Sequence, residues 1–131
     1  MLRPAVFLDR DGVINKDKEY IHKIDDFEWV EGAKESIKYL NNIGYYVFVA
    51  TNQSGIARGY YSERDVILLH EYINNELKKI NAFIDEFFFS PYHPDNTKEF
   101  LHLSHLRKPD TGMLDLAASK WPIDKSRSFL V

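Results

Sequence analysis

The chain has 131 residues, a formal net charge of −3 at pH 7 and no cysteine, and 44% of its residues are hydrophobic. These values predict one globular domain, residues 1–131, and the absence of cysteine excludes disulfides and thiolate metal sites. The mixture of acidic and basic residues argues against a nucleic-acid partner, because proteins that bind nucleic acids usually carry a stripe of basic residues. The N-terminus lacks the features of a signal peptide and no apolar run approaches the roughly 20 residues of a membrane span, so we expect a soluble, cytoplasmic protein without a membrane partner.

Strand and helix patterns alternate from the N-terminus onward. The apolar run AVFL, residues 5–8, predicts a short buried strand, and residues 12–31 have the mixed composition of an irregular flap. Apolar residues at helical spacing after Gly32, with Gly44 as a stop signal, predict a first helix. YYVFVAT, residues 45–51, is typical of a strand that is buried on both faces.

The second half of the chain continues this order. A second helix is predicted from its N-cap Ser62 to about Ile80. Its buried face is expected to consist of Val66, Leu69, Ile73, Leu77 and Ile80. Residues 82–90 predict a third strand, and a third helix is expected from near Met113 to near Pro122, before the closing apolar segment SFLV. The alternation predicts an α/β fold, a parallel sheet with helices on both faces.

Polar residues follow three of the predicted strand segments. Asp9 comes directly after the first strand, Thr51 and Asn52 end the second, and the loop of residues 90–109 follows the third. In parallel α/β sheets, ligands bind at the carboxyl ends of the strands. The sequence therefore predicts a binding site at this edge of the sheet.

The motif DRDG, residues 9–12, is weak by itself, because an ordinary turn stabilised by an Asx hydrogen bond is the commoner explanation. A calcium loop of the EF-hand type is excluded, since Gly12 is fourth rather than sixth and Tyr20 stands where a glutamate is needed. At a strand end, however, Asp9 can attack phosphorus and form an aspartyl-phosphate. Asp11, on the same side of an extended chain, can protonate the leaving alkoxide and later deprotonate water. Two carboxylates beside a phosphate dianion require a hard cation, for which Mg²⁺ is the natural choice.

Phosphoryl transfer also needs donors for the phosphoryl oxygens. Thr51 and the amides of Asn52 and Gln53 are placed for this role, although a simple Thr-Asn turn accounts for the first two equally. Lys108 can neutralise a phosphate as a point charge, with a solvated surface lysine as the ordinary alternative. Arg107 can bind a second anionic group of the substrate.

Three segments in this order, FLDRDGVIN, VATNQSGIARG and RKPDTGM, resemble the haloacid dehalogenase (HAD) superfamily of aspartate-nucleophile phosphatases. Within it the chain is similar to the heptose-1,7-bisphosphate 7-phosphatases and the related histidinol phosphatases, including the flap segment YIHKIDDFEWVEGA. The ARG that follows TNQSGI favours the heptose enzymes. The resemblance implies a Rossmann-like fold without a cap domain, Mg²⁺ as cofactor and a small phosphorylated sugar as substrate.

The resemblance also implies a role for each matched residue. Asp9 corresponds to the nucleophile and a Mg²⁺ ligand, and Asp11 to the general acid/base and a further ligand through its main-chain carbonyl. Thr51 and Lys108 correspond to phosphate stabilisers, and Arg107 to a substrate-recognition position. Substrate contacts are expected from two segments, namely Asn52, Gln53 and Ser54 in the loop and Asp17 to Tyr20 in the flap.

Members of the family commonly carry a zinc-binding loop between the third strand and the RKP segment, and the chain departs from the resemblance there. The four ligand positions of that loop are occupied here by Ser90, Tyr92, Ser104 and Leu106. Nearby histidines that can in principle hold zinc are His93, His102 and His105. We expect ordinary loop histidines and no bound zinc.

A second departure concerns the last strands. In the family a glycine-aspartate motif that completes the magnesium site follows the segment corresponding to SFLV, and then a further strand and helix. The sequence stops at Val131, so we expect the last strands to be missing, as in a fragment of a longer product. An open apolar sheet edge invites pairing, and we expect a monomer or weak self-association through it.

Three functions are compatible with these patterns. The leading interpretation is a Mg²⁺-dependent phosphatase that hydrolyses a sugar bisphosphate, D-glycero-D-manno-heptose 1,7-bisphosphate at its 7-phosphate, through an aspartyl-phosphate. The first alternative is a phosphatase of the same superfamily for histidinol phosphate or another small phosphoester. The second is a catalytically silent phosphate-binding protein, which the missing metal-site segment and zinc loop would explain.

Overall fold

The centre of the molecule is a four-stranded sheet in the order β3-β2-β1-β4, in which every neighbouring pair is parallel. The computed structural model describes residues 1–91 and 112–131. Its strands are β1 (Ala5–Leu8), β2 (Tyr46–Asn52), β3 (Glu86–Ser90) and β4 (Phe129–Leu130). All carboxyl ends therefore meet at one edge of the sheet.

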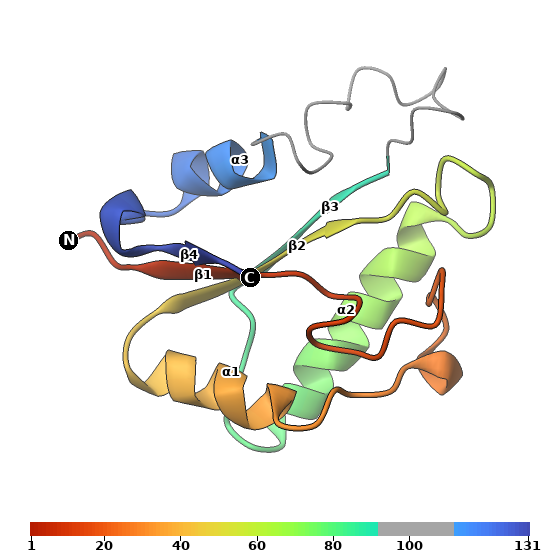
Figure 1. Ribbon diagram of the computed structural model, residues 1–131, viewed down its shortest axis with the longest axis horizontal. Helices are drawn as coiled ribbons and strands as arrows, with labels where there is room; N and C mark the ends of the chain where they lie inside the picture. Colours follow the sequence, from red (N-terminus) through yellow and green to blue (C-terminus); the bar gives the residue numbers. More distant parts are fainter. Residues whose placement is uncertain (92–111) are drawn as a thin grey trace.

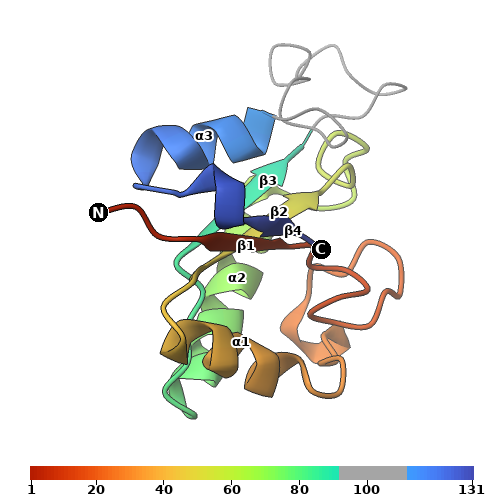
Figure 2. The ribbon, with the colours of Figure 1, turned by 60° about the vertical axis from the view of Figure 1, so that its left-hand side comes forward.

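Helices cover both faces of this sheet, as the sequence predicts (Figures 1 and 2). The helices α1 (Ala33–Asn42) and α2 (Glu63–Lys78) lie on one face, and α3 (Gly112–Lys120) lies on the other. Because side chains alternate along a strand, β1 and β2 supply both cores. The first core includes Val6, Leu8, Val47, Val49, Leu69, Ile73 and Leu77, and the second Phe7, Phe48, Ala50, Met113 and Ala117.

The second helix begins where its cap residue predicts. The Ser62 hydroxyl accepts a hydrogen bond from the Asp65 amide at 3.1 Å, and the Asp65 carboxylate accepts one from the Ser62 amide at 2.9 Å. This reciprocal capping box satisfies two amides that have no partner within the helix. The helix ends at Lys78 rather than near Ile80, and Asn81 then adopts a left-handed φ of 61°.

β3 begins at Glu86, four residues later than the sequence pattern suggests. Two asparagine side chains bind the preceding backbone in place of a neighbouring strand: Asn41 pairs with the amide and carbonyl of Phe83, and Asn74 with those of Ile84. The apolar residues there are anchored to α1 and α2, so regular pairing starts only beyond them.

The flap between β1 and α1 is a folded segment with its own hydrogen bonds. It contains a short 3-10 turn, Ile24–Asp26, and the amide of Val30 donates to the Ile14 carbonyl at 2.8 Å. The side chains of Ile14 and Ile21 are buried in the core under α1 and α2. The flap is thereby fixed next to the carboxyl ends of the strands.

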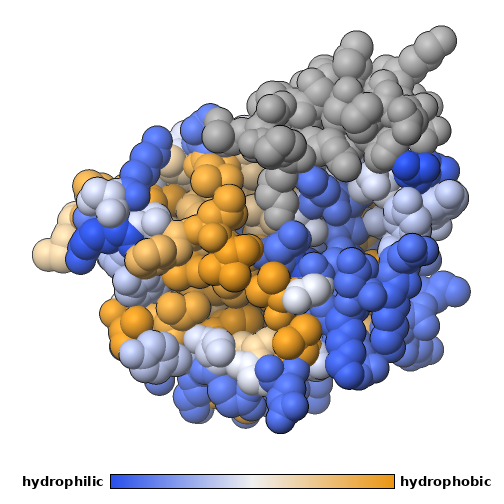
Figure 3. All heavy atoms as spheres, in the orientation of Figure 1, coloured by the Kyte–Doolittle hydropathy of each residue, from blue (hydrophilic) through white to orange (hydrophobic). Residues whose placement is uncertain are grey.

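β4 differs from the other strands because it is short and exposed. Phe129 and Leu130 are 58% and 56% exposed. Apolar side chains gather over this edge and α3, whereas the flap side of the same face is hydrophilic (Figure 3). Within the described ranges, no helix is both long and apolar enough to cross a membrane.

Candidate active site

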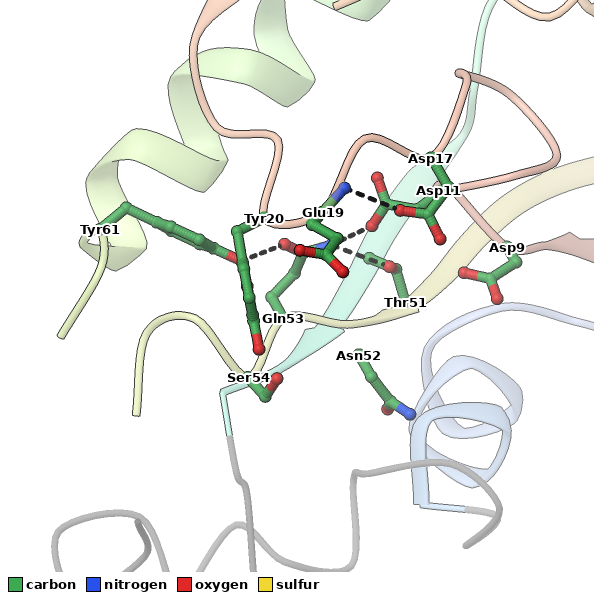
Figure 4. Close-up of a pocket in the computed structure, with 10 residues that line it drawn as sticks. All are labelled: Asp9, Asp11, Asp17, Glu19, Tyr20, Thr51, Asn52, Gln53, Ser54 and Tyr61. Carbon is green, nitrogen blue, oxygen red and sulfur yellow. Dashed lines mark hydrogen bonds between the residues drawn. The ribbon is translucent and has the colours of Figure 1, made fainter. Parts of the chain in front are cut away.

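A cavity of about 300 Å³ lies at the carboxyl ends of β1 and β2, under the flap (Figure 4). It is lined by Asp9, Asp11, Asp17, Glu19, Tyr20, Thr51, Asn52, Gln53, Ser54 and Tyr61. Of the site residues that the sequence predicts within the described ranges, all but Lys18 line this one cavity. Lys18 forms an ion pair with Glu28 instead. The two remaining predicted residues, Arg107 and Lys108, lie outside the described residues.

The end of β1 orients Asp9. The amide of Asp9 donates to the Val131 carbonyl at 3.1 Å, which continues the pairing between β1 and β4. The next amide in the chain, that of Arg10, donates to Asp9 Oδ1 at 2.8 Å. The backbone therefore sets the direction of this carboxylate where the strand opens into the cavity.

The Asp11 carboxylate accepts hydrogen bonds from three side chains. Its Oδ1 accepts from Arg10 Nε at 3.1 Å, from Arg10 Nη2 at 3.0 Å and from Asn15 Nδ2 at 3.1 Å. Its Oδ2 accepts from Arg10 Nη2 and Gln53 Nε2, both at 3.2 Å. Charge-assisted bonds of this kind are about twice as strong as neutral ones, so they fix the carboxylate in position.

The orientation of the Gln53 amide follows from its neighbours. The Tyr61 hydroxyl donates to Gln53 Oε1 at 2.6 Å, and Gln53 Nε2 donates to Thr51 Oγ1 at 2.9 Å as well as to Asp11. Burial raises the pKa of Tyr61 to about 12, so its hydroxyl remains a donor at neutral pH. Tyr61 thus turns the NH₂ group of Gln53 toward Asp11 and Thr51.

A buried cation lies beneath the cavity. The Arg10 side chain is fully buried, and its Nη1 lies 3.5 Å from His70 Nε2 on α2. The His70 ring stacks on Phe87 with the ring centroids 4.3 Å apart. Burial, followed by the Arg10 charge, lowers the pKa of His70 to about 3. His70 is therefore neutral at physiological pH and can accept from the guanidinium.

The flap supplies the wall opposite the sheet. Glu19 and Tyr20 both have left-handed backbone conformations, with φ of 59° and 52°, which are uncommon for residues with side chains. The Tyr20 ring meets the Tyr60 ring edge-on at 4.8 Å, and the His22 ring stacks on Tyr61 at 4.7 Å. Aromatic contacts therefore join the flap to the loop after β2.

Carboxylates dominate the charge of this cavity. Four of its lining residues are acidic, and no basic side chain lines it in the part of the chain that the structure describes. An anionic substrate would be repelled there unless cations accompany it. The site therefore calls for a metal ion, for cationic groups from outside the described residues, or for both.

The available donors fit Mg²⁺ better than a transition metal. The Asp9 carboxylate and the main-chain carbonyl of Asp11 are hard oxygen donors, and Mg²⁺ typically takes one or two carboxylates with water and substrate phosphate completing its shell. Over residues 1–91 and 112–131, no cluster of three or more histidines and acids could hold a metal alone. Of the four positions expected to lack zinc ligands, Ser90 is buried at the end of β3, and Tyr92, Ser104 and Leu106 lie outside the described residues. The histidines that could in principle hold zinc, His93, His102 and His105, also lie outside them.

Sequence reasoning missed Arg10, Asn15 and Tyr61. Arg10 and Asn15 lie within the first motif segment, but their roles depend on side-chain directions that no spacing rule provides. Tyr61 is eight residues from Gln53 and carries no motif of its own. The signals present were the positions of Arg10 between two site aspartates and of Tyr61 just past a site loop.

Known proteins resemble this chain over nearly its whole length. The family model described as polynucleotide kinase 3 phosphatase matches residues 5–131. A relative from Rhodopseudomonas palustris, named D-glycero-beta-D-manno-heptose-1,7-bisphosphate 7-phosphatase, is 45% identical over 98% of this chain. One from Photorhabdus laumondii, named as the phosphatase for the alpha form, is 44% identical over 97% of the chain.

Solved structures agree with the sequence relatives. A HAD-like protein from Mesorhizobium loti superimposes with a TM-score of 0.90 at 32% identity, over 98% of this chain. A D,D-heptose 1,7-bisphosphate phosphatase from B. bronchiseptica, complexed with magnesium and phosphate, gives a TM-score of 0.75 at 31% identity over 89% of the chain. The chain spans 72% of the length of the Rhodopseudomonas relative and 62% and 63% of these two structures.

Proposed function

The chain belongs to the polynucleotide kinase 3 phosphatase family of HAD-like phosphatases, and we propose that it is a Mg²⁺-dependent phosphatase of D-glycero-D-manno-heptose 1,7-bisphosphate that removes the 7-phosphate. The observation that carries this proposal is the meeting of Asp9, Asp11 and Thr51 in one cavity at the carboxyl ends of β1 and β2. Relatives that cover nearly all of this chain are named for that reaction.

Asp9 is the proposed nucleophile. Its carboxylate oxygen attacks the phosphorus, the bond between phosphorus and the sugar oxygen breaks, and an aspartyl-phosphate forms. Asp11 gives its proton to the departing alkoxide. In the second half of the reaction a water attacks the same phosphorus, Asp11 takes the proton of that water, and phosphate is released with Asp9 restored.

The phosphoryl group is proposed to be bound by the β2 side of the cavity. Thr51 and the backbone of Asn52 supply donors for its oxygens, and Lys108 neutralises part of its charge. The Asp9 carboxylate and the Asp11 carbonyl would hold Mg²⁺, which when bound neutralises and orients the phosphoryl oxygens. Arg107 is proposed to bind the second phosphate of the substrate.

Substrate choice is proposed to depend on the residues away from the reacting phosphorus. Ser54, Asp17 and Tyr20 line the cavity together with Asp9, Asp11 and Thr51, so a sugar that carries the reacting phosphate would lie against them, and Gln53 presents its amide beside Asp11. Carboxylate and amide oxygens there can accept hydrogen bonds from sugar hydroxyls. A bisphosphate with a polyol chain suits this arrangement better than the imidazole of histidinol phosphate.

The test is phosphate release with Mg²⁺ from three esters at equal concentration: the alpha and beta anomers of the heptose 1,7-bisphosphate, and histidinol phosphate. We expect kcat/KM for one heptose anomer to exceed that for histidinol phosphate by about 10²-fold or more, since histidinol phosphate lacks the sugar hydroxyls and the second phosphate that the site is proposed to bind. Equal values would overturn the heptose assignment and leave a broader phosphoesterase. Binding of phosphate without turnover of any ester would support the silent alternative.

A further inference from the structure

We propose that Arg10 is a positioning residue that couples the flap turn over the cavity to the carboxylate of Asp11. The inference rests on the proposed function, because Asp11 is the acid/base there. The Arg10 side chain is fully buried and does not line the cavity, so it would act through Asp11 rather than on the substrate itself.

One nitrogen of the guanidinium holds both partners. Arg10 Nη2 donates to Asp11 at 3.0 Å and to the main-chain carbonyl of Ile21 at 2.7 Å. The planar guanidinium cannot move toward one of these acceptors without changing its bond to the other. The position of the carboxylate and that of the flap backbone are therefore linked through a single rigid group.

The segment that Arg10 holds is strained. Ile21 directly follows Glu19 and Tyr20, the two residues with left-handed φ. Such conformations are unfavourable for residues with a side chain and persist only where the surroundings enforce them. The Ile21 side chain is buried in the core and its carbonyl accepts a hydrogen bond from Arg10. The side chain and the backbone of Ile21 therefore both restrain the turn.

The backbone of Arg10 restrains the flap a second time. Its carbonyl accepts from the amides of Ile14 at 2.9 Å and Asn15 at 3.2 Å. Asn15 in turn donates from Nδ2 to Asp11 at 3.1 Å. Arg10 therefore holds the start of the flap through its backbone, and through Asn15 this also restrains the Asp11 carboxylate.

The opposite side of the guanidinium is confined by His70. Its Nε2 lies 3.5 Å from Arg10 Nη1, and its ring is held against Phe87 of β3. A lysine at position 10 would keep the charge but could not reach Asp11, Ile21 and His70 from one fixed fork. Arg10→Lys therefore separates the geometry of the group from its charge.

The experiment compares Arg10→Lys with Arg3→Lys in the whole chain. Arg3 is a matched control, because its Nε donates to the Gly44 carbonyl at 3.0 Å and its guanidinium lies 4.0 Å from the centre of the Tyr46 ring, outside the cavity. Two substrates are used, the heptose bisphosphate and the small ester p-nitrophenyl phosphate. Hydrogen exchange of the amides of residues 17–22 reports on the flap independently of turnover.

We expect Arg10→Lys to lower kcat about 10²-fold with both substrates, the loss typical of a misplacement near 1 Å. KM should rise several-fold for the heptose bisphosphate, which reaches the flap, and change less than twofold for p-nitrophenyl phosphate, which does not. Exchange of residues 17–22 should become at least tenfold faster, and Arg3→Lys should leave kcat, KM and flap exchange within twofold of the wild type.

Wild-type kcat together with wild-type flap exchange in Arg10→Lys would overturn the coupling, as would equal losses in Arg3→Lys. If the wild type hydrolyses no ester, the proposed function fails, but the coupling can still be tested by hydrogen exchange. Faster flap exchange in Arg10→Lys and not in Arg3→Lys then supports the coupling, and unchanged exchange overturns it. Should Arg10→Lys fail to fold, His70→Phe keeps the stack on Phe87 and removes only the acceptor. A several-fold faster flap exchange then supports the proposal, and an unchanged rate overturns it.

Discussion

The carboxyl end of β1 and the neighbouring strand β4 differ in the kind of side chain that they bury. At its carboxyl end, polar side chains that include Arg10, Thr51 and Gln53 are almost completely buried and are bound to one another or to Asp11. Along its edge, β4 leaves Phe129 and Leu130 more than half exposed. One region removes polar groups from water, and the other presents apolar groups to it.

This contrast shows where the fold specifies a single arrangement. Buried hydrogen bonds are directional, and each unsatisfied partner costs about 1–3 kcal/mol, so the polar cluster tolerates few alternatives. Apolar contact at an exposed edge is non-directional and stabilises little. We therefore expect substitutions among the polar residues at the carboxyl end of β1 to lower activity, and substitutions in the core to lower the free energy of unfolding. Substitutions on β4 should change both only weakly.

The largest effect is expected from Asp9→Asn. The amide cannot act as the nucleophile, so phosphate release should fall by about 10⁴-fold or more. Circular dichroism and the urea midpoint should stay close to the wild type, because Asp9 lies at the strand end rather than in the core. Residual turnover near the wild-type rate would mean that the aspartyl-phosphate route is wrong.

The core should show the reverse pattern. Ile73 on α2 is fully buried in the core under β1 and β2, and Ile73→Ala is expected to lower the free energy of unfolding by about 3 kcal/mol. Urea denaturation measures this loss. At a temperature where the variant is folded, its kcat should remain within twofold of the wild type, and a tenfold loss would contradict the separation between core and site.

Substitution of Gly55 is expected to lower both the free energy of unfolding and kcat. A Cβ at this position would lie 2.1 Å from the Tyr61 ring, so Gly55→Ala must displace the residue that orients Gln53. We expect a loss of about 1–3 kcal/mol together with a several-fold lower kcat. Gly59→Ala is the matched control in the same loop, since its φ of 77° strains alanine but nothing lies within 4 Å of the added carbon. Equal kcat values for the two variants would exclude a role for the Tyr61–Gln53 bond.

The buried histidine predicts a pH effect of moderate size. The pKa of His70 is about 3 in the folded protein and near 6.5 when unfolded, so the unfolded chain takes up the proton first as the pH falls. Stability should therefore decrease below pH 6.5, by about 1 kcal/mol between pH 7 and pH 5.5. Urea denaturation of the wild type and His70→Phe at both pH values isolates this contribution, which should be missing from the variant. An identical pH dependence in both would contradict it.

The smallest effect is expected at the exposed edge. Leu130→Lys changes a side chain that is 56% exposed, so the free energy of unfolding should shift by no more than about 0.5 kcal/mol. If the edge supports weak self-association, light scattering at high concentration should fall, because a charge on an edge strand opposes pairing. A loss above 1 kcal/mol would show that β4 is as strongly specified as the polar cluster.

Most of the fold could be predicted because its signals are local. Helical spacing, the Ser62 cap and the nearly continuous apolar run of β2 each concern neighbouring residues. The start of β3 could not be predicted, because it depends on Asn41 and Asn74, whose side chains bind the backbone of residues 83 and 84 from other elements. Their pattern in the sequence is that of ordinary surface asparagines.

The candidate site divides in the same way. Asp9, Asp11 and Thr51 were predictable, since parallel strands bring their carboxyl ends to one edge. The groups that orient them were not. Arg10 and Asn15 lie close to Asp11 in the chain, but their bonds to it depend on how the side chains turn, and the bond from Gln53 to Asp11 crosses 42 positions. Periodicity identifies which residues meet at an edge, but not how their side chains turn there.

The bond from the Asp9 amide to the Val131 carbonyl has a practical consequence for handling the protein. Any chain that continues past Val131, whether natural or a fused purification tag, would begin one hydrogen bond away from the backbone of Asp9, the proposed nucleophile. Met1 is fully exposed at the opposite end of β1, so a tag there would leave that bond undisturbed. A tag is therefore better placed before Met1 than directly after Val131, and comparison of the two placements would show how far a change at this edge reaches Asp9.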